Sequence, residues 1–263
     1  MKKIKCLVSG SLVVALSLGV SSSISFAEEN SVPSNISNIE TVSISEDNVV
    51  FKDDNKEVTV NMENNLNSNN VDINDLKYLV DQANSDGFTE SDEINVYDVS
   101  YDEVSTSPPP KTEQMPQNDE YGAEALLYSY NTTKFFSDRS PGDAKQIISV
   151  AYGQTSHLSK SKTVTAESSY TASVGLNAGA HESLESSLRV NASKTYTKST
   201  DFKGPSKKGY SRMYYATPFY DRGSYNIYKT NKVTGKSSKY ATGDYREASK
   251  QTPIYSWSKD YKN

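Results

Sequence analysis

Few side chains in this sequence are suited to acid–base or metal chemistry. His157 and His181 are the only histidines, and Cys6 is the only cysteine. Zinc clusters and disulfides need more of these residues, and histidine is the commonest general acid–base group. The GxSxG, GxGxxG and P-loop patterns are absent from the sequence. We therefore expect a protein that is not an enzyme.

One spacing is typical of a metal site. The stretch "QANSDGFTESDE", residues 82–93, resembles an EF-hand calcium loop and follows a helix predicted over 73–82. The predicted ligands carry side-chain oxygens, and they are Asn84, Asp86, Glu90 and Glu93. Gln82 and Thr89 depart from the loop pattern, so a capped acidic turn is the alternative. No other cofactor is expected.

The N-terminus is typical of a secretory signal peptide. Basic "MKKIK" precedes apolar "CLVSGSLVVALSLGV", and Ser25-Phe26-Ala27 forms a small-x-small cleavage site. We expect cleavage after Ala27 and a secreted protein. No later stretch approaches the ~18 apolar residues that predict a transmembrane helix.

Charge divides the rest of the chain. Residues 28–120 contain 22 acidic and 4 basic residues, a net charge of −18, whereas residues 121–263 contain 11 and 21, a net charge of +10. The sign changes at "STSPPPKTEQMPQND", whose prolines favour an extended linker. The predicted domains are a signal peptide (1–27), an acidic N-terminal segment that is a candidate pro-region (28–104), a Pro-rich linker (105–120) and a basic, Tyr-rich β domain (121–263).

The most regular pattern lies in the β domain. In "TVTAESSYTASVGLNAGA", residues 163–180, most even positions are apolar and all odd positions are polar or glycine; a second such run follows to residue 197. Each run exceeds the roughly 9–11 residues of a membrane-spanning strand. The pattern predicts an amphipathic hairpin over 163–198. Its predicted lipid-facing residues are Val164, Ala166, Tyr170, Ala172, Val174, Leu176, Leu184, Leu188, Val190, Ala192 and Tyr196.

Two alternatives remain for this region. The hairpin could pack on an ordinary soluble core. Alternatively, "AHESLESSLRV" could form a helix, because Leu184 and Leu188, and also Glu185 and Arg189, are four residues apart.

A second group of residues combines cations with tyrosines, a mixture that suits an anionic membrane interface or another surface ligand. We assign this role to Lys207, Lys208, Arg212, Tyr214, Tyr215, Tyr220 and Arg222. A solvated basic sheet face is the alternative, and an exported protein is not expected to bind nucleic acid.

The predicted fold is mainly β: an elongated antiparallel domain with the long amphipathic hairpin, preceded by an acidic, partly disordered segment with one short helix. A hairpin is predicted at 49–60 in the acidic segment. The β domain's candidate strands are 125–130, 146–152, 162–178, 186–200, 209–219, 224–230, 238–242 and 253–257. Gly235 is expected in the turn at 230–236.

The hairpin lies between "SVAYGQTSHLSKSK" and "KGPSKKGYSRMYYATPFYDRGSYNIYK". In this arrangement, residues 146–230 resemble the insertion region of the aerolysin/ε-toxin-like β-pore-forming toxins. The resemblance implies a soluble monomer that meets membrane lipid or a cell-surface receptor, a homo-oligomeric ring and a β-barrel with one hairpin per subunit. The chain departs from that family in its short β domain, in which no separate receptor-binding domain is assigned.

Two other functions remain open. One is a secreted, non-catalytic β-sandwich module that binds cell-wall or host-surface ligands. The other is a small exported hydrolase built around His157 or His181.

Overall fold

The structure is a computed structural model that describes residues 36–63, 71–85, 93–98 and 127–263. These residues belong to one compact unit. The unit is mainly β, with a large sheet in which antiparallel pairing dominates, and this confirms the predicted fold class. No helix among the described residues is long and apolar enough to cross a membrane.

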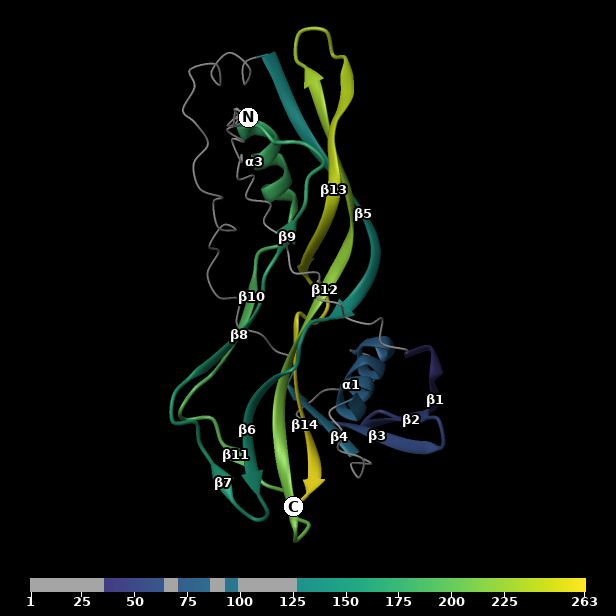
Figure 1. Cartoon of the computed structure of the whole chain (residues 1–263), viewed down its shortest axis with the longest axis vertical. Coiled ribbons are helices and arrows are strands. Elements are labelled where there is room, and N and C mark those ends of the chain that lie inside the picture. The colour runs from purple at the N-terminus through teal and green to yellow at the C-terminus, as the bar shows by residue number, and fades with distance from the viewer. Residues whose placement is uncertain (1–35, 64–70, 86–92, 99–126) are drawn as a thin grey trace, which may run out of the picture. The chain divides into compact units, whose positions relative to one another are not determined.

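The central strand is β12, Tyr210–Asn231. Its first half pairs with β6 (Lys145–Ala151) and β14 (Ile254–Lys262), and its second half pairs with β5 (Tyr128–Pro141) and β13 (Ser237–Ala248), all antiparallel (Figure 1). The partners change after Pro218, whose carbonyl accepts a hydrogen bond from the Gly142 amide at 2.7 Å. The sheet can tolerate a proline at this point because the ladder is already changing partners.

β12 joins two strands that the sequence predicts separately. The polar stretch between 219 and 224 was predicted as a break, but Asp221 and Arg222 pair with both β5 and β13. Asp221 is buried and bound by the Arg139 guanidinium at 3.0 Å. Because its charge is compensated inside the sheet, an acidic residue can lie within the strand.

The acidic segment contributes η1 (Ile36–Asn38), β1 (Ile39–Ile44), β2 (Asn48–Asp53), β3 (Lys56–Met62), α1 (Ile73–Ser85) and β4 (Glu93–Asp98). The predicted helix and the β2–β3 hairpin are confirmed. β3 pairs with β4 in parallel, and β4 pairs with β14, so these strands continue the sheet built on β12. Leu76 and Leu79 of α1 belong to the same buried cluster as Trp257.

The predicted continuous strands over 162–178 and 186–200 are wrong. The region contains β8 (Lys162–Ala166), β9 (Ser169–Tyr170), α3 (Ala178–Ser187) and β10 (Ala192–Tyr196). α3 confirms the helical alternative. Asn177 caps this helix by accepting a hydrogen bond from the Ala180 amide at 3.0 Å, and Leu184 is fully buried. A helix forms here instead of a strand because the four-residue spacing places Ala180, Leu184 and Leu188 in one apolar cluster.

Short pairs complete the structure. β7 (Thr155–Ser156) pairs with β11 (Phe202–Lys203). The turn between β12 and β13 contains Gly235 at a φ of +68°, as the sequence predicts.

Candidate functional site

The 162–196 segment runs from β8 through β10. β8 and β10 pair antiparallel over five residues, with Ala166 opposite Ala192 and Val164 opposite Lys194. Even-numbered residues of β8 therefore lie opposite even-numbered residues of β10. Val164, Ala166 and Ala192 lie in a buried cluster, whereas the odd face is joined by hydroxyl contacts between Thr163 and Thr195 at 2.9 Å and between Thr165 and Ser193 at 3.0 Å. The alternation predicted from the sequence is thus observed in the paired strands β8 and β10, which we call the stem.

Beyond the stem, residues 169–175 run along the outer edge of β13. Ser169 and Tyr170 pair with Arg246 and Tyr245. The Thr171 and Ser173 amides donate to the carbonyls of Asp244 and Thr242 at 2.9 and 2.8 Å. We call residues 169–175 the edge cap of β13. The cap satisfies backbone groups that an edge strand would otherwise expose.

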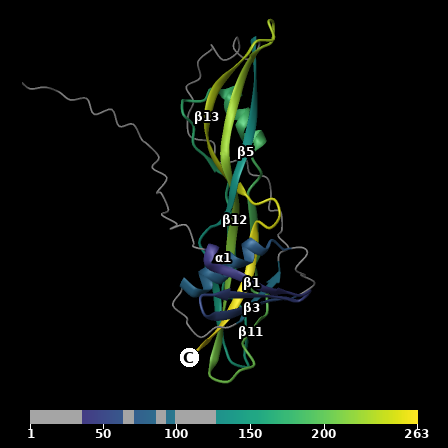
Figure 2. The same ribbon diagram turned by 90° about the vertical axis from the view of Figure 1, so that its right-hand side faces the viewer.

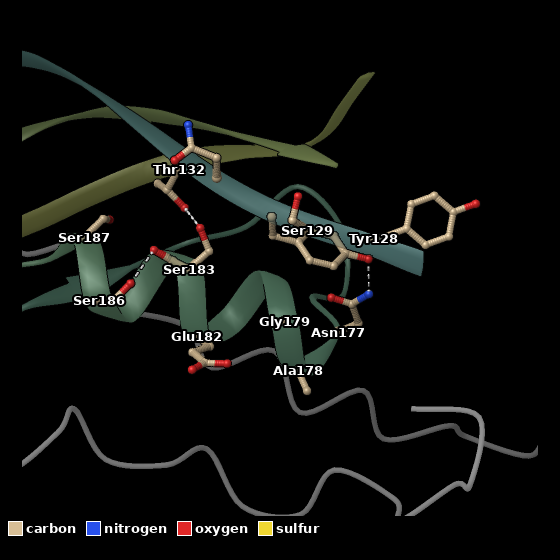
Figure 3. Close-up of a pocket in the computed structure, with 12 residues that line it drawn as sticks. Tyr128, Ser129, Thr132, Asn177, Ala178, Gly179, Glu182, Ser183, Ser186 and Ser187 are labelled. Atoms are coloured by element: carbon tan, nitrogen blue, oxygen red, sulfur yellow. Dashed lines mark hydrogen bonds between the residues drawn. The ribbon is translucent and has the colours of Figure 1, made fainter. Parts of the chain in front are cut away.

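α3 packs on the sheet formed by β5, β12 and β13. Its apolar face contacts a cluster that contains Tyr225, Ile227 and Tyr245. A groove of about 660 Å³ lies between α3 and β5, lined mainly by tyrosine, amide and hydroxyl side chains (Figure 3). Asn177 donates to the Tyr130 hydroxyl at 2.5 Å, and Ser183 contacts Thr132 at 2.9 Å. The helix therefore rests on β5 through polar contacts as well as through its apolar face.

An ion-pair network, which the sequence analysis missed, anchors the end of α3. The Arg189 guanidinium binds Asp221 and lies 3.1 Å from Glu247, while the Arg189 amide donates to Glu247 at 2.7 Å. Lys134 of β5 pairs with the same Glu247 carboxylate at 2.8 Å. Glu247 and Asp221 are almost fully buried, so their charges need these cations. Acidic residues within the basic domain of residues 121–263 are the one sequence signal that points to the network.

The network continues toward α1. Arg139 binds Asp221 at 3.0 Å, Asp72 at 3.2 Å and Asp75 at 3.4 Å. Burial raises the pKa of Asp75 to about 7; Arg139 opposes the shift, whereas Asp72 adds to it. The Tyr255 hydroxyl donates to Asp75 at 3.0 Å. Contiguous charged contacts therefore connect α1, the central strand and Arg189, which lies just beyond the C-cap of α3.

The residues predicted to face lipid lie in several environments. Most are buried in the two clusters described above: Val164, Ala166, Leu176, Leu184, Leu188, Ala192 and Tyr196. Tyr170 is half-buried, and its hydroxyl lies 2.7 Å from Nδ1 of His181. Ala172 is exposed, and Val174 and Val190 are each 49% exposed. Part of the apolar face is therefore left in water.

The predicted basic and aromatic surface is not one continuous patch. Tyr214, Tyr215 and Tyr220 are buried, and Tyr215 stacks on Trp257 with ring centroids 4.5 Å apart. Arg212 binds Asp260 through two hydrogen bonds of 2.6 and 3.1 Å, and Arg222 is partly buried. Lys207 and Lys208 are exposed. The tyrosines thus serve largely as core residues.

The candidate calcium loop is described only in part. Asn84 donates to the Asp53 carboxylate at 2.5 Å, and Glu93 begins β4. Asp86 and Glu90 lie outside the described residues. The Gln82 amide is turned toward the sheet, where it donates to the Gly142 carbonyl and accepts from Thr217. Within the described ranges no three His, Cys, Asp or Glu residues gather as a metal site. Calcium binding stays a prediction.

Each of the two histidines lies beside a carboxylate that is accessible to solvent. His157 is exposed and lies 3.3 Å from Asp201, and His181 lies 3.9 Å from Glu185 on α3.

Comparison of the chain with family models, curated proteins and solved structures gives no match. Function must therefore be argued from the geometry of the 162–196 segment.

Proposed function

We propose that this chain is a secreted, membrane-active protein of the β-pore-forming kind, which inserts residues 163–198 as an amphipathic hairpin. One observation carries the proposal: the register of the β8–β10 stem. Because even positions already face even positions there, extending the same ladder keeps both apolar runs on one side. A ladder shifted by one residue would mix the two faces.

The extended ladder has consistent partners along its length. It places Tyr170 opposite Leu188 and Val174 opposite Leu184, and its centre falls on Gly179. Glycine is favoured in turns because it adopts conformations that other residues avoid. Gly179 now lies in the first turn of α3 against the Tyr130 ring, where an added Cβ would be 2.8 Å from a ring carbon.

Charges on the even face mark the ends of the spanning part. Glu182 and Lys194 bracket residues 183–193, and within that bracket no even position carries a charge. The bracket matches the roughly 9–11 residues that a tilted strand needs to cross the hydrocarbon core. Glu167 and Arg189 occupy odd positions, on the side that would face water.

Insertion requires three local changes. α3 must unwind, the edge cap must leave β13, and Arg189 must leave Asp221 and Glu247. The stem can keep its register throughout. Val174 and Val190 are already half-exposed and Ala172 is exposed, so the soluble form leaves part of this face unburied.

A second candidate function rests on the groove between α3 and β5. Its tyrosine, asparagine, serine and threonine side chains could bind a polar, hydroxyl-bearing ligand. This arrangement favours a secreted module that binds cell-wall or host-surface ligands. In that case α3 would remain folded during function.

Paired lysine substitutions test insertion in the chain that begins at Glu28. Ala172→Lys and Val190→Lys place a charge on the even face near the middle of the proposed span, and Ser173→Lys is the matched odd-face control. The lipid-facing charges should cost about 2–4 kcal/mol per subunit near the midplane, and the control should cost little. Dye release from liposomes should therefore be lost in the first two variants and retained in the third.

All three variants should remain folded, because Ala172 and Ser173 are exposed and Val190 is half-exposed in the soluble form. Circular dichroism and thermal unfolding provide this control. Equal dye release by all three would reject insertion of this hairpin. Failure of the unmodified chain to release dye from any lipid mixture, combined with binding to wall polymers or glycans, would favour the binding module.

A further inference from the structure

β5 and β13 flank the central strand at the same level. Thr133 of β5 and Thr242 of β13 both pair with Asn226 of β12. The three strands lie side by side in both views of the molecule (Figures 1 and 2). β5 and β13 have 14 and 12 residues, so the two outer edges of this part of the sheet are similar in length.

The edge of β13 is covered by the edge cap, and the cap is closely fitted. Gly243 lets the Thr171 carbonyl approach so closely that an added Cβ would lie 1.9 Å from that oxygen. The Tyr225 hydroxyl donates to the same carbonyl at 2.6 Å. The cap belongs to the 162–196 segment, so the release required for insertion also uncovers the backbone of β13.

The outer edge of β5 pairs with no strand among the described residues. Phe135 and Phe136 are 47% and 61% exposed on this edge strand. An open edge with large apolar side chains is a template for strand pairing. Among the described residues, one edge of this part of the sheet is therefore unpaired, and the other is covered by the segment that insertion would release.

We propose that β13 of one copy pairs with β5 of a second copy once the edge cap has left, and this proposal rests on the release invoked for the proposed function. Both strands run antiparallel to β12, so copies in the same orientation would form a parallel β13–β5 ladder. Such a head-to-tail contact uses two different surfaces and can close into a ring.

Charge supports a second copy of this chain as the partner. Asp138 on β5 and Arg246 on β13 both pair with Arg222 of β12, so an acidic and a basic side chain lie at the same level on the two edges. In the monomer the Arg246 guanidinium lies over the Tyr220 ring, 3.5 Å from its centroid, so it must turn outward for the two opposite charges to meet between copies. The cap thereby couples assembly to release, since a capped monomer offers only one of the two edges.

Cysteine crosslinking between separately labelled copies tests the contact. Asn131→Cys, Thr133→Cys and Phe135→Cys place thiols along the outer edge of β5, and Thr242→Cys places one on β13. The chain beginning at Glu28 contains no other cysteine. Each β5 variant is mixed with the Thr242→Cys variant on liposomes, oxidised and analysed on non-reducing gels. We expect disulfide-linked dimers in at least one mixture and none from any variant alone.

Release of the edge cap from β13 can be varied without any lipid present. Gly243→Ala should displace the cap and increase the crosslinked fraction at least several-fold in liposome-free solution. A Ser173→Cys/Thr242→Cys pair should lock the cap to β13 and prevent higher assemblies, measured by analytical ultracentrifugation, until a reductant is added.

The outcomes separate the two proposals. Crosslinked mixtures without dye release support the β13–β5 contact and count against pore formation. Dye release without mixed dimers at any β5 position overturns the contact and leaves the proposed function standing. Dimers from a β5 variant alone also overturn the contact, because they show β5 pairing with itself.

Discussion

The sheet around β14 and the 162–196 segment both contain antiparallel strand pairs, but they pack differently: β14 is buried on both faces from Ile254 to Lys259. In the first region Phe51, Phe219, Tyr255 and Trp257 are fully buried in one cluster with α1. In the second, the stem strands have five residues each, small and hydroxyl side chains predominate, and Val174 and Val190 are half-exposed. Large aromatics bury more area than alanine and valine, so the first region should open last.

This contrast also concerns the acidic segment. β1 to β4 and α1 cover one side of Trp257 and Tyr255. A removable pro-region over residues 28–104 would therefore have to uncover the largest side chains of the core. The described part of the segment belongs to this buried cluster, which we call the frame, and removal of residues 28–104 stays a prediction.

The largest expected effect is in the frame. Trp257→Ala removes a fully buried side chain that stacks on Tyr215 and donates to Thr217 at 2.9 Å. The free energy of unfolding should fall by about 3–5 kcal/mol, measured by urea denaturation. Val233→Ala, at a residue that is 80% exposed, is the control and should change it by less than about 0.5 kcal/mol. A loss below about 1 kcal/mol for Trp257→Ala would contradict the assignment of this region as the stable frame.

A second effect should depend on pH. The folded pKa of Asp75 is about 7, raised from 3.8 by burial, so its contribution to stability is complete below about pH 4 and is lost as pH rises through 7. Asp75→Asn removes this titration while leaving an oxygen that can accept from Tyr255. The variant should melt a few degrees higher than the unmodified chain at pH 8 and show a smaller gain at pH 5.

The Asp75→Asn variant keeps the neighbouring groups that face residue 75, which are Arg139, Asp72 and Tyr255. The control is Asp143→Asn, because Asp143 is exposed and lies 4.0 Å from Lys145. Thermal melts between pH 5 and 8 check the effect. Parallel curves for the Asp75 variant and the unmodified chain would show that Asp75 does not titrate in this range.

The smallest effect should be local to the 162–196 segment. Arg189→Ala removes the bonds to Asp221, Glu247 and the Ala248 carbonyl, but Arg139 and Lys134 still pair with the two carboxylates. We expect a local cost of about 1–2 kcal/mol. Hydrogen exchange of the amides in 169–187 should accelerate roughly 5- to 30-fold, with β12 unchanged.

Arg189→Lys, which keeps the positive charge, should show a smaller acceleration. If the Arg189→Ala change accelerated exchange equally in β12 and in 169–187, then the segment and the frame would open together. That result would remove the distinction between the two regions.

Local spacing was sufficient to predict several elements. α1, the β2–β3 hairpin and the glycine turn at 230–236 each follow from neighbouring residues, because an apolar stripe or a turn residue settles the conformation there. The mainly β class also follows from the sequence. In the stem, the apolar even positions Val164, Ala166 and Ala192 are buried together, as the alternation predicts.

Tertiary contacts decided the rest. Residues 178–187 satisfy both a strand pattern and a helix pattern, and α3 forms because Ala180 and Leu184 can bury on Tyr225 and Ile227 only as a helix capped by Asn177. β12 remains continuous through Asp221 because Arg139 and Arg189, both distant in sequence, neutralise that carboxylate. The sequence alone determined which residues alternate. The tertiary structure decided which alternating residues became strand, edge cap or helix, because burial and charge compensation depend on side chains far away along the chain.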